Sequence, residues 1–227
     1  MLTLAILGAN GQIGRSLAAS LANQPLLKLK LFSRDIKNLE EFVHTISNNN
    51  VQIDFFQLDE FSNHKFDIVV NAIGEGSRTR QLALGAKMFD TSAYYDCLVI
   101  KYLIVNPKTL YFFISSGAVY GFNTEWPVNM NSVFSYPVNS QSNTDHYPLS
   151  KIVNEARHSC YPDLKIYDVR IFGFFSQYIN IKDSFFLSEV ADAIISNKTL
   201  ITDNTDMVRD YISGSELGSL ISSYMQG

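Results

Sequence analysis

The sequence has few cysteines, no long apolar run and no cluster of basic residues. Its 227 residues include two cysteines, Cys97 and Cys160, which excludes a disulfide-rich secreted scaffold and a paired-cysteine metal site. No window approaches the roughly 18 consecutive apolar residues that a membrane-spanning helix needs. The 18 Lys plus Arg against 22 Asp plus Glu, without a basic run, argue against a nucleic-acid groove. We therefore expect a cytoplasmic protein that binds neither nucleic acid nor membranes.

Short apolar segments alternate with longer stretches of helical period. Segments rich in Leu, Ile, Val and Phe predict strands at 2–7, 26–32, 52–58, 67–72, 109–114 and 165–171. Most are near-continuous apolar runs, which is typical of a parallel sheet with helices on both faces. Residues 12–23 and 149–160 have the period of amphipathic helices. This order predicts an α/β fold, a doubly wound parallel sheet of the Rossmann type formed by residues 1–227 as one domain. Residues 122–146, rich in Asn and Ser, predict a long loop.

Three glycines join the first predicted strand to the first helix. Gly8, Gly11 and Gly14 have the spacing G-x-x-G-x-x-G. Gly8 permits a sharp turn, Gly11 allows backbone to approach a phosphate, and Gly14 allows the helix to pack closely on the strand. The helix start offers unpaired N–H groups and a positive dipole end. The spacing favours a dinucleotide pyrophosphate site over a plain turn. The predicted cofactor contacts here are Gly8, Asn10, Gly11, Gln12, Ile13 and Gly14.

The end of the second predicted strand bears on which dinucleotide binds. An acidic residue there would accept a hydrogen bond from the ribose 2′-hydroxyl of NAD. Here Ser33 and Arg34 stand first, and Asp35 follows one position later. A hydroxyl and a guanidinium suit a 2′-phosphate, so the sequence favours NADP, with NAD as the other cofactor that it allows. The alternative is that Arg34 is a solvated residue paired with Asp35.

A tyrosine and a lysine lie four residues apart at the start of the helix that follows the fifth predicted strand and its loop. Tyr147 and Lys151 project from one helical face, where a lysine is expected to lower the tyrosine pKa and allow acid/base chemistry. The spacing alone is weak, because Tyr161/Lys165 and Tyr178/Lys182 share it. Only Tyr147 opens a helix after the fifth strand. That strand ends in the hydroxyl pair Ser115-Ser116, at the sheet edge where such folds bind ligands.

Five segments stand in the order and rough spacing of a known family: the glycine turn, Ser115-Ser116-Gly117-Ala118-Val119-Tyr120-Gly121, Tyr147-x-x-x-Lys151, Val169-Arg170-Ile171-Phe172 and Val208-Arg209-Asp210-Tyr211-Ile212. On these segments the chain resembles the extended short-chain dehydrogenase/reductases of the nucleotide-sugar epimerase/dehydratase group. The resemblance runs from Leu2 to about Leu220.

The resemblance implies roles for particular residues. Ser116 matches the catalytic Ser/Thr that bonds the reacting oxygen, Tyr147 the acid/base, and Lys151 the residue that orients the nicotinamide ribose. Arg209 matches an arginine that grips a substrate diphosphate; an ion pair with Asp210 is the alternative. For Asp59 the alternative is a turn cap. Further positions implied to line the cofactor are Asp59, Asn71, Ala72, Ile73 and Phe172.

Two departures from the family pattern limit the expected reaction. Dehydratases of this group carry Asp-Glu after the catalytic Ser/Thr, whereas Gly117-Ala118 stand here, which disfavours a 4,6-dehydratase. The carboxyl-terminal part is short, so residues 173–210 are expected to form a reduced substrate lobe. We expect an NAD(P)-dependent oxidoreductase or epimerase of a nucleotide-linked sugar, without a metal. A homodimer is expected on resemblance alone. The rival hypothesis is a regulatory or sensor module that binds NADP without turnover.

Overall fold

The structure is a computed structural model of the chain. It describes residues 1–46, 51–121, 127–129, 131–136, 139, 146–183, 185–202, 204 and 208–225. Most of the predicted loop at 122–146 therefore lies outside the described residues. Among the described helices, none combines the length and the hydropathy that crossing a bilayer would need.

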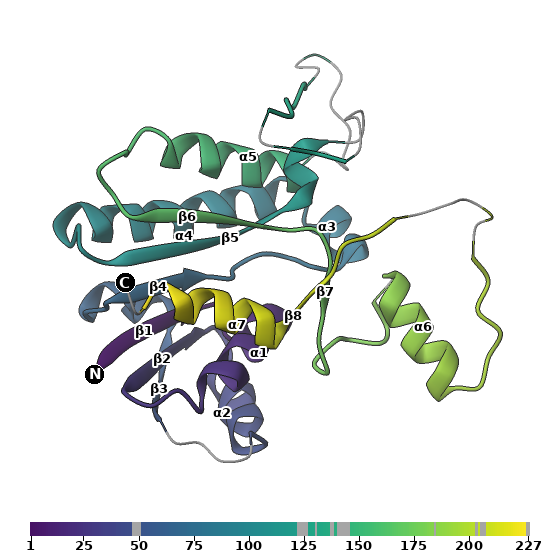
Figure 1. Cartoon of the computed structure of the whole chain (residues 1–227), viewed down its shortest axis with the longest axis horizontal. Helices are drawn as coiled ribbons and strands as arrows, with labels where there is room; N and C mark the ends of the chain where they lie inside the picture. The colour runs from purple at the N-terminus through teal and green to yellow at the C-terminus, as the bar shows by residue number, and fades with distance from the viewer. Residues whose placement is uncertain are drawn as a thin grey trace.

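A parallel sheet of six strands forms the centre of the described chain (Figure 1). Its strands are β1 (Leu2–Leu7), β2 (Leu27–Ser33), β3 (Gln52–Gln57), β4 (Ile68–Asn71), β5 (Leu110–Ser116) and β6 (Ile166–Ile171). The spatial order is β3-β2-β1-β4-β5-β6, which confirms the predicted doubly wound fold. The spatial order in which successive strands are added reverses between β1 and β4, and in such folds the carboxyl ends of the two strands at this point flank the crevice that binds ligands.

The strand boundaries follow the prediction with small shifts. β2 begins one residue later than expected because Leu26 has a φ of +69°, a left-handed conformation that cannot continue a strand. The crossover helix after β5 begins earlier than expected, at His146. Pro148 sits in its first turn, where no intrahelical donor is lost.

Helices cover both faces of the sheet, as Figure 1 shows. One face carries α1 (Gln12–Leu21), α2 (Ile36–His44) and α7 (Gly214–Ser223), and the other carries α4 (Ala86–Val105) and α5 (His146–His158). The remaining elements are η1 (Leu58–Asn63), α3 (Arg78–Leu84), η2 (Gly117–Tyr120), β7 (Phe174–Phe175), α6 (Phe186–Ile195) and β8 (Ile212–Ser213).

The central strand β1 shows why the apolar runs are continuous. Leu4 and Ile6 pack into the core under α1 and α7, whereas Ala5 and Leu7 pack into the core under α4. All four side chains are fully buried, so neither face of the strand tolerates a polar residue. The sheet thus lies between two apolar layers. Polar side chains that bind a ligand are therefore expected at its carboxyl edge.

The segment between β6 and α7 leaves the sheet. β7 and β8 form a separate two-stranded parallel sheet, and Figure 1 shows α6 standing apart from the main sheet beyond them. This segment spans the residues predicted to form a reduced substrate lobe.

Candidate active site

The glycine turn brings three backbones into close contact. Gly8 has a φ of +76°, and a Cβ there would lie 3.0 Å from the backbone of Ala72 and Ile73 beyond β4. A Cβ on Gly14 would lie 2.4 Å from the Gly8 carbonyl oxygen, closer than any side chain permits. Gly8 therefore requires glycine for the sharp turn that the sequence suggested, whereas Gly14 requires it because the helix packs closely on the turn, where the sequence suggested packing on the strand.

The start of α1 is arranged to receive an anion. Gly11 is the N-cap residue, and no side chain caps the first turn of the helix. The side-chain nitrogen of Gln12 is buried without a hydrogen-bond partner among the described residues. Uncapped helix N–H groups and a buried donor beside a glycine turn are what a pyrophosphate would satisfy. The predicted contacts at this turn fit a dinucleotide on these observations.

Two residues at the end of β2 differ in their surroundings: Ser33 is hydrogen-bonded within the protein, and Arg34 is exposed. The Ser33 hydroxyl is buried, accepts from the Asp35 N–H at 3.1 Å and donates to the Asp35 carbonyl at 3.3 Å. Asp35 caps α2 by accepting from the Asn38 N–H at 3.1 Å. Arg34 is exposed and forms no salt bridge with Asp35 in the described structure. The guanidinium, not the hydroxyl, is thus the group available for a ligand.

Arg34 and Asp59 lie at the same edge of the sheet, after β2 and β3. Both act electrostatically on Tyr95 of α4: burial raises the pKa of this phenol, with Asp59 adding to the rise and Arg34 opposing it. Asp59 is exposed in η1, where Gln57 and Glu60 form the capping box. The alternative reading of Asp59 as the cap is therefore wrong.

Asn71 serves the protein interior. Its side chain is buried, donates to the Tyr111 hydroxyl at 3.1 Å and accepts from the Ile73 N–H at 3.0 Å. With both ends of the amide engaged, Asn71 fixes the peptide that runs past Gly8. Direct cofactor contact by its side chain stays a prediction, whereas the Ala72 and Ile73 backbone lies at the turn.

The three predicted catalytic side chains converge between β5 and α5. The Ser116 hydroxyl lies close enough to the Tyr147 phenol to affect its pKa, and its Oγ accepts from the Ala118 N–H at 3.2 Å. Lys151 is buried, and its Nζ donates to the Ile114 carbonyl of β5 at 2.8 Å and lies 4.6 Å from the centre of the Phe113 ring. The hydroxyl, the phenol and the amine thus lie at the carboxyl end of β5.

The pKa shift of Tyr147 differs from the one expected from its spacing with Lys151. Burial raises the pKa of Tyr147, and the neighbouring Ser116 hydroxyl only partly opposes this rise. The expected lowering by Lys151 is wrong here because Nζ contacts the strand carbonyl, and no hydrogen bond joins it to the phenol in the described structure. Burial also lowers the pKa of Lys151 to about 8, against the opposing influence of Asp96 and Glu155.

A family profile described as "NAD dependent epimerase/dehydratase family" matches residues 4–226. The chain belongs to the NAD-dependent epimerase/dehydratase family. This confirms the resemblance that the five segments carried and the class of enzyme that it implied. No curated protein sequence matches the chain significantly.

Solved structures share the fold of this family member at low sequence identity. A UDP-N-acetylglucosamine 4-epimerase from Methanobrevibacter ruminantium superposes with a TM-score of 0.78 at 18% identity, covering 96% of this chain and 71% of its own. A UDP-glucose-4-epimerase from Stenotrophomonas maltophila has a TM-score of 0.76 at 17% identity, with 100% and 74% covered. A dTDP-glucose 4,6-dehydratase from Bacillus anthracis has a TM-score of 0.72 at 14% identity, with 98% and 70% covered.

The structure explains the glycine that departs from the pattern of the family's dehydratases. A Cβ at Gly117 would lie 2.5 Å from the Phe172 ring. Phe172 follows β6, is 42% exposed and stacks on Tyr120 with ring centres 5.9 Å apart. The ring therefore covers the backbone of Gly117, immediately after Ser116, the serine predicted to be catalytic. In the lobe, the Arg209 guanidinium lies 5.8 Å from the centre of the Phe186 ring of α6.

Two residues at this edge of the sheet, Arg15 and Glu155, were not predicted from the sequence. Arg15 follows the last glycine and donates to the Asn10 side chain through Nε at 3.1 Å and Nη2 at 2.5 Å, and to the side chain of Asn38. The position of Arg15, a basic residue directly after the third glycine, could have indicated a role at the turn. Glu155 bonds Ser115 across 40 positions, a contact that no local pattern indicates.

Proposed function

We propose that this protein is an NAD-dependent epimerase of a nucleotide-linked sugar. The observation that carries the proposal is the convergence of Ser116, Tyr147 and Lys151 at the carboxyl end of β5, the sheet edge that also holds the uncapped start of α1. The Stenotrophomonas structure contains bound NAD and a formylated UDP-arabinopyranose, which supports this ligand class for the shared fold.

The side chains have distinct tasks in such a reaction. A dinucleotide held at the glycine turn and the start of α1 would supply the hydride acceptor for the sugar carbon and the donor that returns the hydride. Ser116 would hold the oxygen on that carbon, and Tyr147 would exchange its proton. Because burial raises the pKa of Tyr147, the phenol is protonated at neutral pH and suited to donate to a keto oxygen. Lys151, with a pKa of about 8, is mostly charged at neutral pH and would orient the nicotinamide ribose of the bound dinucleotide.

The packing around Gly117 supports epimerisation over dehydration. A carboxylate at this position would have to displace the Phe172 ring, since even a Cβ would approach it to 2.5 Å. Elimination of water needs an acid and a base beyond the tyrosine, and this part of the site lacks room for one. We further propose that residues 173–210, with Arg209, cover the sugar nucleotide.

A second candidate function is the one-way reduction of a keto-sugar with NADP. The exposed Arg34 guanidinium favours it, because a free cation at the end of β2 suits a 2′-phosphate. Replacing Arg34 by alanine should then weaken NADP binding about tenfold or more and leave NAD binding unchanged. Lys37→Ala, at an exposed position on α2, is the matched control.

Turnover and binding separate the hypotheses. We expect NAD and a UDP-sugar to raise the melting temperature, and the C4 epimer of the sugar to appear by NMR with catalytic NAD. Tyr147→Phe should keep cofactor binding and abolish turnover, whereas the control Tyr161→Phe should retain both. Consumption of stoichiometric NADPH would identify the reductase. Cofactor binding without turnover of any nucleotide sugar by the unaltered protein would contradict the enzyme and favour the sensor. A homodimer and a cytoplasmic location stay predictions.

A further inference from the structure

We infer that Glu155 is a positioning residue, which fixes the strand carrying Ser116 against the helix carrying Tyr147 and Lys151. The inference rests on the proposed function, because it assigns to Glu155 a task in arranging that catalytic site.

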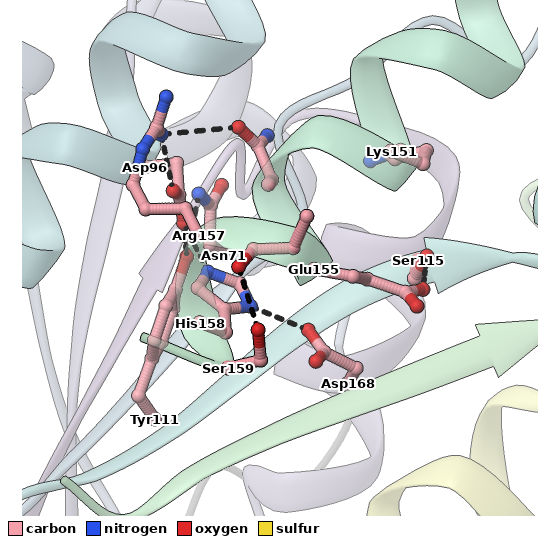
Figure 2. A network of polar contacts seen from close by, with 12 residues as sticks. Asn71, Asp96, Tyr111, Ser115, Lys151, Glu155, Arg157, His158, Ser159 and Asp168 are labelled. Atoms are coloured by element: carbon pink, nitrogen blue, oxygen red, sulfur yellow. Dashed lines mark hydrogen bonds and ion pairs between the residues drawn. The ribbon is translucent and has the colours of Figure 1, made fainter. Parts of the chain in front are cut away.

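The Glu155 carboxylate joins α5 to β5 directly. Its Oε1 accepts from the Ser115 hydroxyl at 2.5 Å, and Figure 2 shows Glu155 extending from α5 toward Ser115. Ser115 is 3% exposed, and the Glu155 side chain is 10% exposed, so water does not readily replace this bond. Ser115 immediately precedes Ser116, and Glu155 lies one turn of α5 beyond Lys151. One short contact therefore links the backbones that carry the catalytic groups.

Arg170 extends the link to two further elements. It donates to Glu155 Oε2 through Nη2 at 2.6 Å and Nε at 3.0 Å, and through Nη1 to the Tyr120 hydroxyl at 2.7 Å. Arg170 of β6 is also the register partner of Ser115 in the sheet. The carboxylate consequently holds α5, β5, β6 and, through Tyr120, the 3-10 turn η2 that follows Ser116. A paired, bidentate arrangement of this kind fixes geometry as well as charge.

The same carboxylate acts on the charge of the site. Glu155 and Asp96 both raise the pKa of Lys151 against the larger effect of burial. Removing the negative charge should lower this pKa further, so that less of the amine is charged at neutral pH. Glu155 thus affects the position of Ser116 and the protonation of Lys151, while its two oxygens accept from Ser115 and Arg170.

The test compares Glu155→Gln, Glu155→Ala and Ser115→Ala with Asp54→Asn. The control removes another carboxylate of the sheet, bonded to Lys28 at 2.8 Å on the opposite edge. Since a displacement near 1 Å costs about a hundredfold in rate, we expect Glu155→Ala to lower kcat by about that factor. KM and the cofactor Kd should change less than threefold. Glu155→Gln, which keeps an acceptor for Ser115, should recover part of the loss, and Asp54→Asn should match the unaltered enzyme.

Two further readouts separate positioning from general stability. The high-pH limb of kcat, where the Lys151 charge is lost, should move to lower pH in Glu155→Gln and stay in place in Ser115→Ala. The double variant Ser115→Ala/Glu155→Ala should be no slower than Glu155→Ala alone, because both remove the same link. If Glu155→Ala does not fold, Glu155→Gln and Ser115→Ala decide the question. The inference would be overturned if kcat were unchanged in both Glu155→Gln and Ser115→Ala and the high-pH limb of Glu155→Gln did not move.

A failure of the proposed function is recognisable separately. If the unaltered protein converts no sugar, the pKa of Lys151 is measured instead by ¹³C NMR of labelled lysine, with Lys151→Arg to assign the resonance. A lower Lys151 pKa in Glu155→Gln than in the unaltered protein would support the link from Glu155 to Lys151. An identical pKa would refute the inference whatever the reaction is.

Discussion

Replacing His158 by glutamine should remove a pH-dependent part of the stability. His158 lies on α5 between two carboxylates: Nε2 is 2.8 Å from Asp96 Oδ1 and Nδ1 is 2.6 Å from Asp168 Oδ1 (Figure 2). Both ring nitrogens can donate only in the charged imidazolium. Burial alone would lower the pKa of His158, but the bonds to Asp168 and Asp96 outweigh it and raise the pKa to about 9.

The magnitude follows from linkage. The ordinary histidine pKa of 6.5 and the native value of about 9 differ by about 2.5 units, equivalent to about 3 kcal/mol. Because the native pKa is raised, this stability is fully present below pH 6.5 and is lost as the pH rises through 9. Lys151 acts in the opposite sense: its pKa falls from 10.5 to about 8, so its contribution to stability increases between those values. The two contributions oppose each other only above pH 8.

Urea denaturation from pH 6 to 9 measures the effect. The free energy of unfolding of the unaltered protein should fall by about 2 kcal/mol between pH 6.5 and 8, and this fall should be absent from His158→Gln. The difference between the two proteins should shrink by about 3 kcal/mol by pH 9. His44→Gln, at an exposed position on α2, is the control and should follow the unaltered protein. A difference that stays constant over this range would refute the assignment of the imidazolium.

Two glycine substitutions test the packing of the site. Gly14→Ala should lower stability by about 1 to 3 kcal/mol and abolish dinucleotide binding, because its Cβ would lie 2.4 Å from a carbonyl oxygen of the turn. Gly76→Ala, with no atom within 4 Å, should change neither, and equal effects would contradict the reasoning. Gly117→Ala should cost about 1 to 2 kcal/mol in urea denaturation, and Phe172→Leu should relieve much of that cost; no relief would argue against the clash.

The sequence alone determined the six strands and the parallel, doubly wound class of the sheet. Continuous apolar runs separated by helical periods can bury both faces of a strand only in a covered parallel sheet, and the structure has that sheet. The roles of Gly8 and Gly14 could also be predicted from the sequence, because the backbone at these positions accepts only one residue type. A positive φ and a backbone approach of under 3 Å are requirements that glycine alone meets, so the residue type itself carries the information.

The tertiary structure alone decided which polar side chains at the carboxyl edge of the sheet are buried and which are exposed. Ser33 is bonded within its own turn and Asn71 is turned into the core, while Arg34, one residue from Ser33, is exposed. Bonds such as those of His158 with Asp96 and of Glu155 with Ser115 join residues 62 and 40 positions apart. Apolar burial repeats with the period of a helix or strand and is visible in the sequence. A buried hydrogen bond depends on one pair of atoms meeting in space, and therefore leaves no period from which it can be predicted.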